Sequence, residues 1–395
     1  MSTNKKHVII VGGGPAGLIA AAQLKDSDCT VTIIDQKPTV GRKFLVAGEG
    51  GFNVTHSEPV LDFIEKYDND WIKKCVRTYP SKQFRKYLKQ IGIPTIVGSS
   101  GKVFPEEIIK PAQVLSAIKT DIAQHVSYEL GATVVDFDAA TVTIEKESVR
   151  STLHFDFLIF ALGGASWQKT GSDGLWVSLF AQKEIAVSPF TASNSGLILY
   201  DNWMSEAKDG MLLKNVVVSV GKTACSGDVL LTSYGLEGKP IYAVNRALKS
   251  LEKPVISIDL KPQMAIEKIQ QTLKKAKNPT QGLKELKLGE LALIWLRQFV
   301  SKENYNSPEQ LAKQIKAFKI GVQSFRPIDE VISSAGGVAI AEINEHGQLH
   351  KYPSVFCCGE MVDWDAPTGG YLIQGCVSSG YVAGQAIRSL LIDAG

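Results

Sequence analysis

The sequence predicts an α/β fold in which a parallel sheet covered by helices is interrupted by an inserted domain of strands followed by helices. Three observations support it. The first 35 residues have the order strand, glycine turn, helix, strand. The apolar run at residues 155–162 is typical of a strand buried on both faces. Between residues 190 and 325 short β runs give way to lysine-rich helices, after which strands and glycine turns return.

Composition is that of an ordinary globular protein. The chain has 395 residues, 44% hydrophobic and 21% charged, and its length indicates two domains or one domain with an insertion. A net charge of +3 is near neutral for this length, so we expect no nucleic-acid partner. The six cysteines lack the spacing of a metal site, so we expect no metal. Their usage favours a reducing cytoplasm.

The N-terminal region resembles a secretion signal only superficially. Lys5 and Lys6 precede an apolar run, but glycines and Pro15 interrupt that run. No stretch approaches the ~18 uninterrupted apolar residues of a transmembrane helix. We therefore expect a cytoplasmic protein without a membrane span.

The elements of the first domain follow in order. Residues 7–11 and 30–34 are β-rich and flank a helix at 15–25, so the two strands should be parallel. Further predicted elements are helical structure at 58–92, a helix at 111–124 that begins with proline, strands at 126–137 and 141–145, and a final helix at about 375–392.

Residues 190–325 are predicted to form the insertion, with a β unit at about 190–262 and a helical part at about 263–320. Residues 1–189 and 326–395 then form one domain. The helical part is rich in lysine, but its periodic leucines indicate solvated helix faces rather than a basic binding patch.

The main chemical signal is a glycine fingerprint directly after the first strand. Gly12 permits a tight turn, Gly14 lets the backbone approach a pyrophosphate, and Gly17 lets the helix pack closely on the strand. The pyrophosphate would lie at the helix N-terminus. Asp35 ends the second strand 18 residues after Gly17, where a carboxylate suits a ribose hydroxyl. This fingerprint serves NAD as well as FAD.

Two further features favour FAD. Arg42 and Lys43 can bring cations near phosphates, although they could also form a solvated basic loop. The strand that ends in Ala161 runs into two glycines, an exit that many flavoproteins place near the nucleotide. A plain buried strand and turn would give the same pattern.

A third feature lies near the end of the chain. An apolar run at 355–358 ends in Gly359 and Glu360, and a Gly369-Gly370 turn follows before the last helix. Glu360 can accept a hydrogen bond from a ribityl hydroxyl. The glycine turn lets backbone N–H groups approach a flavin ring, and the helix N-terminus favours an electron-rich ring.

A glycine fingerprint at the start and a Gly-acid motif near the end resemble the glutathione-reductase-like flavoproteins. Residues 41–56 and 358–381, with the inserted segment 231–238, resemble the BaiN/YhiN-like flavoproteins in particular. The resemblance implies a Rossmann-like FAD-binding domain around an inserted substrate or cap domain. It places the FAD contacts on Gly12, Gly14, Ala16, Gly17, Asp35, Gln36, Arg42, Lys43, Gly48, Val134, Ala161, Glu360, Gly370, Tyr371 and Gln374.

The sequence also departs from related patterns. The family often has Arg-Cys where this chain has Gly51-Phe52, which indicates a side branch. Residues 150–330 contain no second glycine fingerprint, so a separate NAD(P)H-binding domain is not expected. The cysteine pair of disulfide reductases is also absent between Arg42 and Asn53.

Acid–base candidates are few, and we assign no catalytic residue. His56 lies in the glycine loop and could donate a proton beside a flavin, or it could make a structural hydrogen bond. Trp167 and Tyr371 could pack on the ring or simply within the protein.

These features predict an FAD-dependent oxidoreductase in which NAD(P)H, a transient electron donor, drives reduction of a small organic acceptor. The family resemblance favours a carbon–carbon double bond as the acceptor. Two alternatives stay open: a non-catalytic flavin-binding redox sensor or scaffold, and a flavin-dependent RNA-modifying enzyme.

Overall fold

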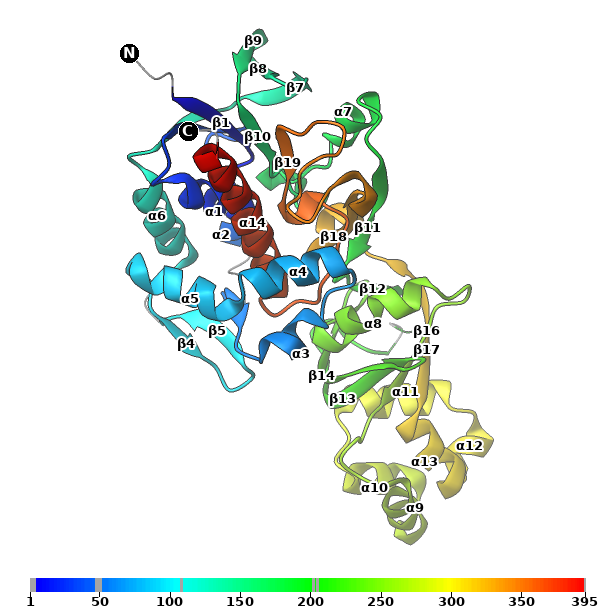
Figure 1. Ribbon diagram of the computed structural model, residues 1–395. Helices are drawn as coiled ribbons and strands as arrows, with labels where there is room; N and C mark the ends of the chain where they lie inside the picture. The colour runs from blue at the N-terminus through cyan, green and yellow to red at the C-terminus, as the bar shows by residue number, and fades with distance from the viewer. Residues whose placement is uncertain (1–4, 47–51, 107–108, 201–202, 204–205, 394–395) are drawn as a thin grey trace. The chain divides into compact units, whose positions relative to one another are not determined.

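The structure, a computed structural model, describes residues 5–46, 52–106, 109–200, 203 and 206–393 (Figure 1). The chain divides into two compact units. We call Met1–Thr191 with Ser333–Gly395 the sheet unit, and Ala192–Ile332 the barrel unit. No helix within the described residues is both long enough and apolar enough to cross a membrane.

The sheet unit is built on a five-stranded parallel sheet. Its strands, in order across the sheet, are β19 (Val355–Cys357), β10 (Phe157–Phe160), β1 (Lys6–Val11), β2 (Cys29–Asp35) and β6 (Val126–Leu130). β1 is central, and its residues Val8, Ile9 and Ile10 are fully buried. Continuous apolar strands are what a parallel sheet with both faces covered requires. The predicted α/β class is confirmed.

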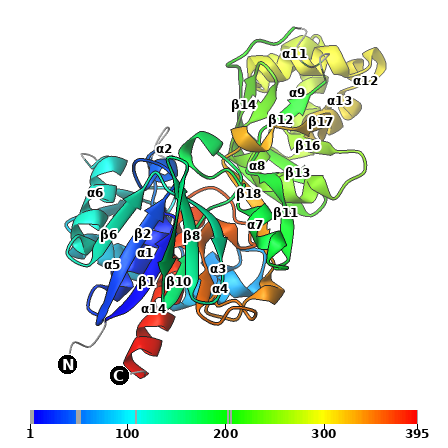
Figure 2. The same ribbon diagram turned by 90° about the horizontal axis from the view of Figure 1, so that it is seen from above.

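Two helices pack against each other on this sheet, α1 (Pro15–Leu24) and α14 (Tyr371–Asp393) (Figure 1 and Figure 2). A Cβ atom on Gly380 would lie 2.2 Å from the carbonyl oxygen of Ala16, and one on Gly384 would lie 2.7 Å from that of Ala20. These two glycines of α14 therefore let the helices approach closely. Residues 333–395 thereby complete the unit that the first 35 residues begin.

The remaining elements of the sheet unit cover the sheet and its edges. The helices are α2 (Arg42–Val46), α3 (Val60–Ile64), α4 (Asp70–Thr78), α5 (Ser81–Gln90), α6 (Pro111–Ile122) and α7 (Val177–Gln182). The strands form three small sheets, β3 (Thr55–His56) with β5 (Lys102–Pro105) and β4 (Thr95–Val97), β7 (Thr133–Phe137) with β8 (Thr141–Lys146) and β9 (Val149–His154), and β11 (Val187–Ser193) with β18 (Ser333–Val338).

Two predicted elements of the sheet unit clearly differ in their limits. The single strand predicted at 126–137 is two strands, because Gly131 turns the chain with a φ of +73°. β6 before it joins the parallel sheet, and β7 after it joins an antiparallel one. The final helix starts at Tyr371, four residues before its predicted start, because the positive-φ turn at Gly369 and Gly370 ends directly before it.

The barrel unit contains a closed barrel, in which β12 pairs with both β15 and β17. Its strands are β12 (Leu197–Leu199), β15 (Gly235–Glu237), β14 (Thr223–Thr232), β13 (Leu212–Val220), β16 (Val255–Asp259) and β17 (Phe318–Phe325). Its helices are α8 (Lys239–Lys249), α9 (Ile266–Lys275), α10 (Pro279–Glu285), α11 (Glu290–Phe299), α12 (Lys302–Asn306) and α13 (Pro308–Lys316).

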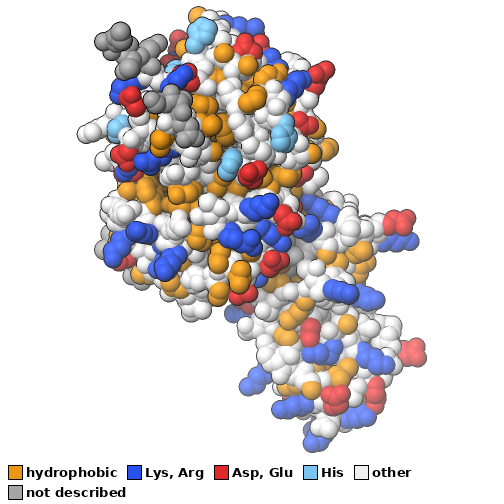
Figure 3. Space-filling view, in the orientation of Figure 1, with side chains coloured by type: hydrophobic (Ala, Val, Ile, Leu, Met, Phe, Trp, Pro, Cys, Tyr) orange, Lys and Arg blue, Asp and Glu red, His pale blue; other side chains and the backbone are white. Residues whose placement is uncertain are grey.

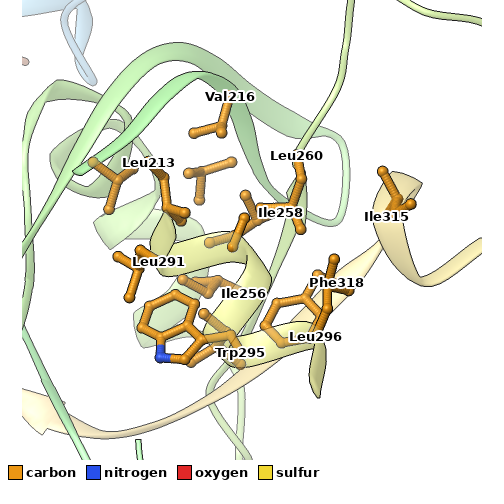
Figure 4. Close-up of a cluster of buried hydrophobic side chains, with 14 of the residues drawn as sticks. Leu213, Val216, Ile256, Ile258, Leu260, Leu291, Trp295, Leu296, Ile315 and Phe318 are labelled. Atoms are coloured by element: carbon orange, nitrogen blue, oxygen red, sulfur yellow. The ribbon is translucent and has the colours of Figure 1, made fainter. Parts of the chain in front are cut away.

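The core of the barrel unit joins α11 to the strands (Figure 4). Trp295 of α11 is fully buried and its ring stacks on that of Phe318, with 6.2 Å between centroids. The predicted helical part ended at about 320, but β17 begins at Phe318. The period-two burial of Phe318, Ile320 and Val322 belongs to a strand that faces this core.

Candidate functional site

The glycine turn after β1 is tightly packed at two of its three fingerprint positions. Gly12 has a φ of +107°, and a Cβ atom there would lie 2.2 Å from the carbonyl oxygen of Ala161, at the end of β10. A Cβ atom on Gly17 would lie 2.0 Å from the carbonyl oxygen of Gly12. The fold itself therefore requires glycine at both positions.

Gly14 differs, because a Cβ atom there would have no protein atom within 4 Å. Its φ of −78° is open to any residue, and it is the N-cap of α1 without a side-chain capping bond. Neither backbone conformation nor packing explains this glycine. Open space at the N-terminus of a ten-residue helix fits a phosphate group, because the free N–H groups and the dipole of the helix favour negative charge there.

A cavity of about 380 Å³ surrounds this turn at the carboxyl ends of β1, β2 and β10. This is where open α/β sheets bind their ligands. The cavity is lined by ten of the residues predicted to contact FAD, namely Gly12, Gly14, Ala16, Asp35, Gln36, Arg42, Lys43, Val134, Ala161 and Glu360.

The Asp35 side chain is fixed at one end of this cavity. One carboxylate oxygen accepts the backbone N–H of Gly13 at 2.9 Å, and the other accepts that of Lys37 at 2.8 Å. Burial raises the pKa of Asp35, and these two hydrogen bonds oppose that rise. Gln36 donates to the carbonyl oxygen of Gly171, which ties a second loop to the same end.

The carboxylate of Glu360 is fixed in the cavity wall by two partners. Its Oε2 lies 2.6 Å from the Nζ of Lys43, which also donates to the Ser166 hydroxyl at 2.8 Å. Its Oε1 accepts the backbone N–H of Ser334 at 3.2 Å. The sequence motifs pointed to Lys43 and Glu360, but not to the two serines. No pattern near either serine could have shown that it lies beside them.

Among the described residues, the other predicted site residues lie outside the cavity lining. Gly17 packs beneath the turn, and Gly48 lies outside the described residues. The side chain of Gln374 is fully buried, where it accepts the hydroxyl of Thr55 at 2.7 Å and donates to the carbonyl oxygen of Tyr79 at 2.9 Å. Its backbone N–H donates to the carbonyl oxygen of Gly370 at 3.0 Å, so neither the side chain nor the N–H of Gln374 is left for a ligand.

Gly370 and Tyr371 lie at the start of α14 beside a second polar cluster. A Cβ atom on Gly370 would lie 2.5 Å from the carbonyl carbon of Thr55, so this turn rests on β3. The Tyr371 hydroxyl donates to Glu58 Oε1 at 2.6 Å, and its ring stacks on His56 with 5.4 Å between centroids. Sequence reasoning missed Glu58, and its only signal was the nearby His56.

The hydrogen bonds of His56 distinguish between its two predicted roles. Its Nε2 lies 3.1 Å from the carbonyl oxygen of Ser100, which can only accept, so Nε2 carries a hydrogen. The backbone N–H of Glu58 donates to Nδ1 at 3.2 Å, which requires a lone pair there. Both ring nitrogens are thus engaged by backbone groups. The geometry favours the structural role of His56 over that of proton donor.

Trp167 is 37% exposed and does not line the cavity. The structure therefore gives no support to the expectation that its ring packs on a ligand in this cavity. In the described ranges, no group of three or more His, Cys, Asp or Glu side chains could hold a metal ion. All six cysteines are free thiols.

Comparison with known families and proteins gives consistent results. The family model of the HI0933-like protein Rossmann domain matches residues 6–386. A 3-dehydro-bile acid delta(4,6)-reductase from Clostridium scindens is 24% identical, covering 95% of this chain and 98% of the relative. A ribosomal RNA dihydrouridine synthase from Haemophilus influenzae is also 24% identical, covering 96% and 98%.

Among solved structures, a 3-ketosteroid delta1-dehydrogenase from Sterolibacterium denitrificans has a TM-score of 0.52 at 11% identity, covering 98% of this chain and all of that one. At this identity the likeness concerns the fold alone. Together, the family match and the relatives confirm the predicted class of the chain, a flavin-dependent oxidoreductase.

Proposed function

Because the chain belongs to the family of HI0933-like Rossmann-domain proteins, we propose that it is an FAD-dependent reductase of a carbon–carbon double bond in an organic acceptor. NAD(P)H is the proposed electron donor. The observation that carries the FAD part is the open space beside Gly14, at the N-terminus of α1, in a cavity that Asp35 and Glu360 also line.

Each part of the cavity has a proposed role in holding FAD. The N–H groups at the start of α1 bind the pyrophosphate, Asp35 accepts a ribose hydroxyl, and Glu360 accepts a ribityl hydroxyl. Arg42 and Lys43 add positive charge near the phosphates. Backbone groups of Gly370 and Tyr371 approach the ring. Bound FAD supplies hydride and electron transfer, while the protein positions and tunes it.

The names of the relatives support the choice of acceptor. One is named a delta(4,6)-reductase of a 3-dehydro-bile acid, and the other a dihydrouridine synthase. Both of these names describe a reaction that adds hydrogen across a ring double bond conjugated to a carbonyl group. We therefore propose an α,β-unsaturated carbonyl compound as the acceptor class of this chain, with a small molecule as the first candidate.

RNA is a second candidate acceptor, favoured by how charge is distributed. Residues 192–332, the barrel unit, hold 20 Lys and Arg against 14 Asp and Glu, a net charge of +6. The rest of the chain holds 23 against 26, a net charge of −3. Basic side chains are spread over the visible face of the barrel unit, with acidic ones among them (Figure 3). The near-neutral net charge of the whole chain, from which we expected no nucleic-acid partner, is therefore the sum of a basic barrel unit and a slightly acidic remainder.

Anaerobic spectroscopy of the purified protein tests the proposal. We expect yellow protein with bound FAD that NADH or NADPH bleaches, and whose colour returns on adding a Δ4-3-ketosteroid or a uridine-containing ribosomal RNA fragment. The acceptor that restores colour identifies the class. Bound flavin that neither nucleotide reduces would favour the flavin-binding redox sensor or another electron donor, and protein that cannot bind FAD would contradict the proposal.

A cytoplasmic location stays part of the proposal, based on cysteine usage.

A further inference from the structure

A hydrogen-bonded acid pair lies at the start of α14, outside the cavity lining. The Tyr371 hydroxyl donates to Glu58 Oε1 at 2.6 Å. Tyr371 is 7% exposed, and the Glu58 side chain is 18% exposed. This is a short contact between two groups that can both carry a proton, and the cofactor-binding roles proposed above do not explain it.

Neighbouring side chains and backbone groups hold this pair in place. The two nitrogens of His56 are engaged by backbone groups, which leaves the ring to stack on Tyr371. Behind Tyr371, the hydroxyl of Tyr67 donates to its carbonyl oxygen at 2.6 Å, and the ring of Phe63 lies 4.8 Å from its own. The pair is therefore preorganised, as an acid–base site requires.

The tyrosine of the pair and the lining of the proposed FAD cavity share one helix, α14. Cys376 lines that cavity and follows Tyr371 by five residues on the same helix, which is about 7.5 Å along the helix axis. Both residues belong to the sheet unit. Within that unit, α14 thus carries both the tyrosine of the acid pair and a residue that lines the cofactor cavity.

Building on the proposed function, we propose that Glu58 and Tyr371 form the proton relay that completes reduction of the double bond. Such a reduction adds a hydride to one carbon and a proton to its neighbour, and the two electrons arrive with the hydride from reduced FAD. The neighbouring carbon bonds to the hydroxyl proton of Tyr371 as that O–H bond breaks. The relay starts from the protonated form of Glu58, whose carboxyl proton passes to the Tyr371 oxygen. The carboxylate that results accepts the hydrogen bond of the restored Tyr371 hydroxyl, as in the structure, and water then reprotonates Glu58.

A relay has a physical advantage over direct donation by the tyrosine alone. Burial and the hydrogen bond to Glu58 raise the pKa of Tyr371, so its hydroxyl stays protonated at neutral pH. A tyrosinate left beside a carboxylate would be costly. This state is avoided when Tyr371 receives the proton of Glu58 at the same time as it gives up its own.

Half-reactions that need no natural electron donor test the relay. The FAD-loaded protein is reduced with dithionite, then mixed with a Δ4-3-ketosteroid or with ferricyanide, which takes up electrons without a proton. Tyr371→Phe and Glu58→Gln should each slow reoxidation by the ketosteroid by about 100-fold or more, and leave reoxidation by ferricyanide unchanged. Tyr87→Phe, the matched control, removes another tyrosine–carboxylate hydrogen bond, that to Asp121, and should behave as the wild type in both.

A second measurement separates the relay from the proposed function. In D2O, the oxidised protein should exchange the α-hydrogen of the saturated ketone for deuterium, and both variants should lose this exchange. In the apoprotein, the losses in Tm of the two variants should not add in the double variant, because the two side chains share one hydrogen bond.

The outcomes are distinct. Wild-type protein that the ketosteroid does not reoxidise, but that shows relay-dependent exchange, would contradict the acceptor class and support the relay. Normal reoxidation by the ketosteroid in both variants would overturn the relay and leave the proposed function standing. If the wild type shows neither reoxidation nor exchange, both proposals fail.

Discussion

Lys43 Nζ lies 2.6 Å from Oε2 of Glu360, which is 317 residues further along the chain. This ion pair joins α2 to the turn after β19 at the wall of the proposed FAD cavity. The Glu360 side chain is 12% exposed and that of Lys43 is 26% exposed. A carboxylate so shielded from water depends on its partners, so under the proposed function the lysine orients Glu360 for a ligand hydroxyl.

We expect Lys43→Met to weaken FAD binding by about 10- to 100-fold and to lower the free energy of unfolding by ~1–3 kcal/mol, because it leaves the carboxylate of Glu360 poorly paired. FAD fluorescence titration and urea unfolding measure the two effects. Lys43→Arg keeps the charge and should lose less of both. Wild-type FAD affinity in the methionine variant would contradict the role of the pair.

The glycines of the turn after β1 should separate packing from ligand space. Gly14→Ala should leave the stability of the apoprotein within ~1 kcal/mol of the wild type, because its Cβ atom meets no protein atom. It should still weaken FAD binding strongly. Gly17→Ala places a Cβ atom 2.0 Å from a carbonyl oxygen and should lower the stability itself by ~1–3 kcal/mol or more. Thermal unfolding of the apoproteins and FAD titration make the comparison. Unchanged FAD affinity in Gly14→Ala would exclude a pyrophosphate at this turn.

The sequence predicted those parts of the site that depend on local chain geometry. The turn at Gly12 and Gly14, the strand that ends at Asp35 and the final helix all follow from glycine positions and short apolar runs. Pairings across the chain carry no such signal. Glu58 meets Tyr371 from 313 residues away, and Ser166 meets Lys43 from 123 away. Only the folded arrangement of β3 and α14 brings the acid pair together.

The barrel shows the same limit. Individual runs such as Val255–Asp259 were recognisable as strands, but closure depends on the pairing of β12 with β17, more than 100 residues apart. Very short strands such as Leu197–Leu199 have no clear period in the sequence, so sequence patterns did not predict closure.

Asp35 should make FAD binding depend on pH. Burial raises the pKa of Asp35, so the protonated form stabilises the folded apoprotein at low pH, and this contribution is lost as pH rises. A ribose hydroxyl, in contrast, binds best to the carboxylate form of Asp35. FAD affinity should therefore weaken on acidification, starting above the ordinary Asp value of 3.8. Titrations from pH 4 to 8 measure it. Asp35→Asn should bind FAD about 10- to 100-fold less tightly at pH 7 and remove this component, leaving the titration of the adenine. Constant wild-type affinity down to pH 4 would contradict the assignment.

The final prediction concerns alkaline stability of the barrel unit. Glu237 accepts hydrogen bonds from the hydroxyls of both Tyr234 and Tyr242. Burial and the bond to Glu237 raise the pKa of Tyr234 to about 12 and raise that of Tyr242 as well. A raised tyrosine pKa stabilises the folded state below pH 10, and this contribution is lost as pH rises from there towards the folded value.

We therefore expect the free energy of unfolding to fall between pH 10 and 11.5, by roughly 1 kcal/mol after allowance for solvent screening at the half-exposed Tyr234. Glu237→Gln removes the charge that opposes ionisation. It should be less stable than the wild type at pH 7.5 but lose less stability at high pH. Tyr305→Phe is the control, because that hydroxyl meets Thr280 rather than a carboxylate. Urea unfolding at pH 7.5, 10 and 11.5 gives the comparison. Parallel pH curves for the wild type and Glu237→Gln would show that Glu237 does not control the ionisation of these tyrosines.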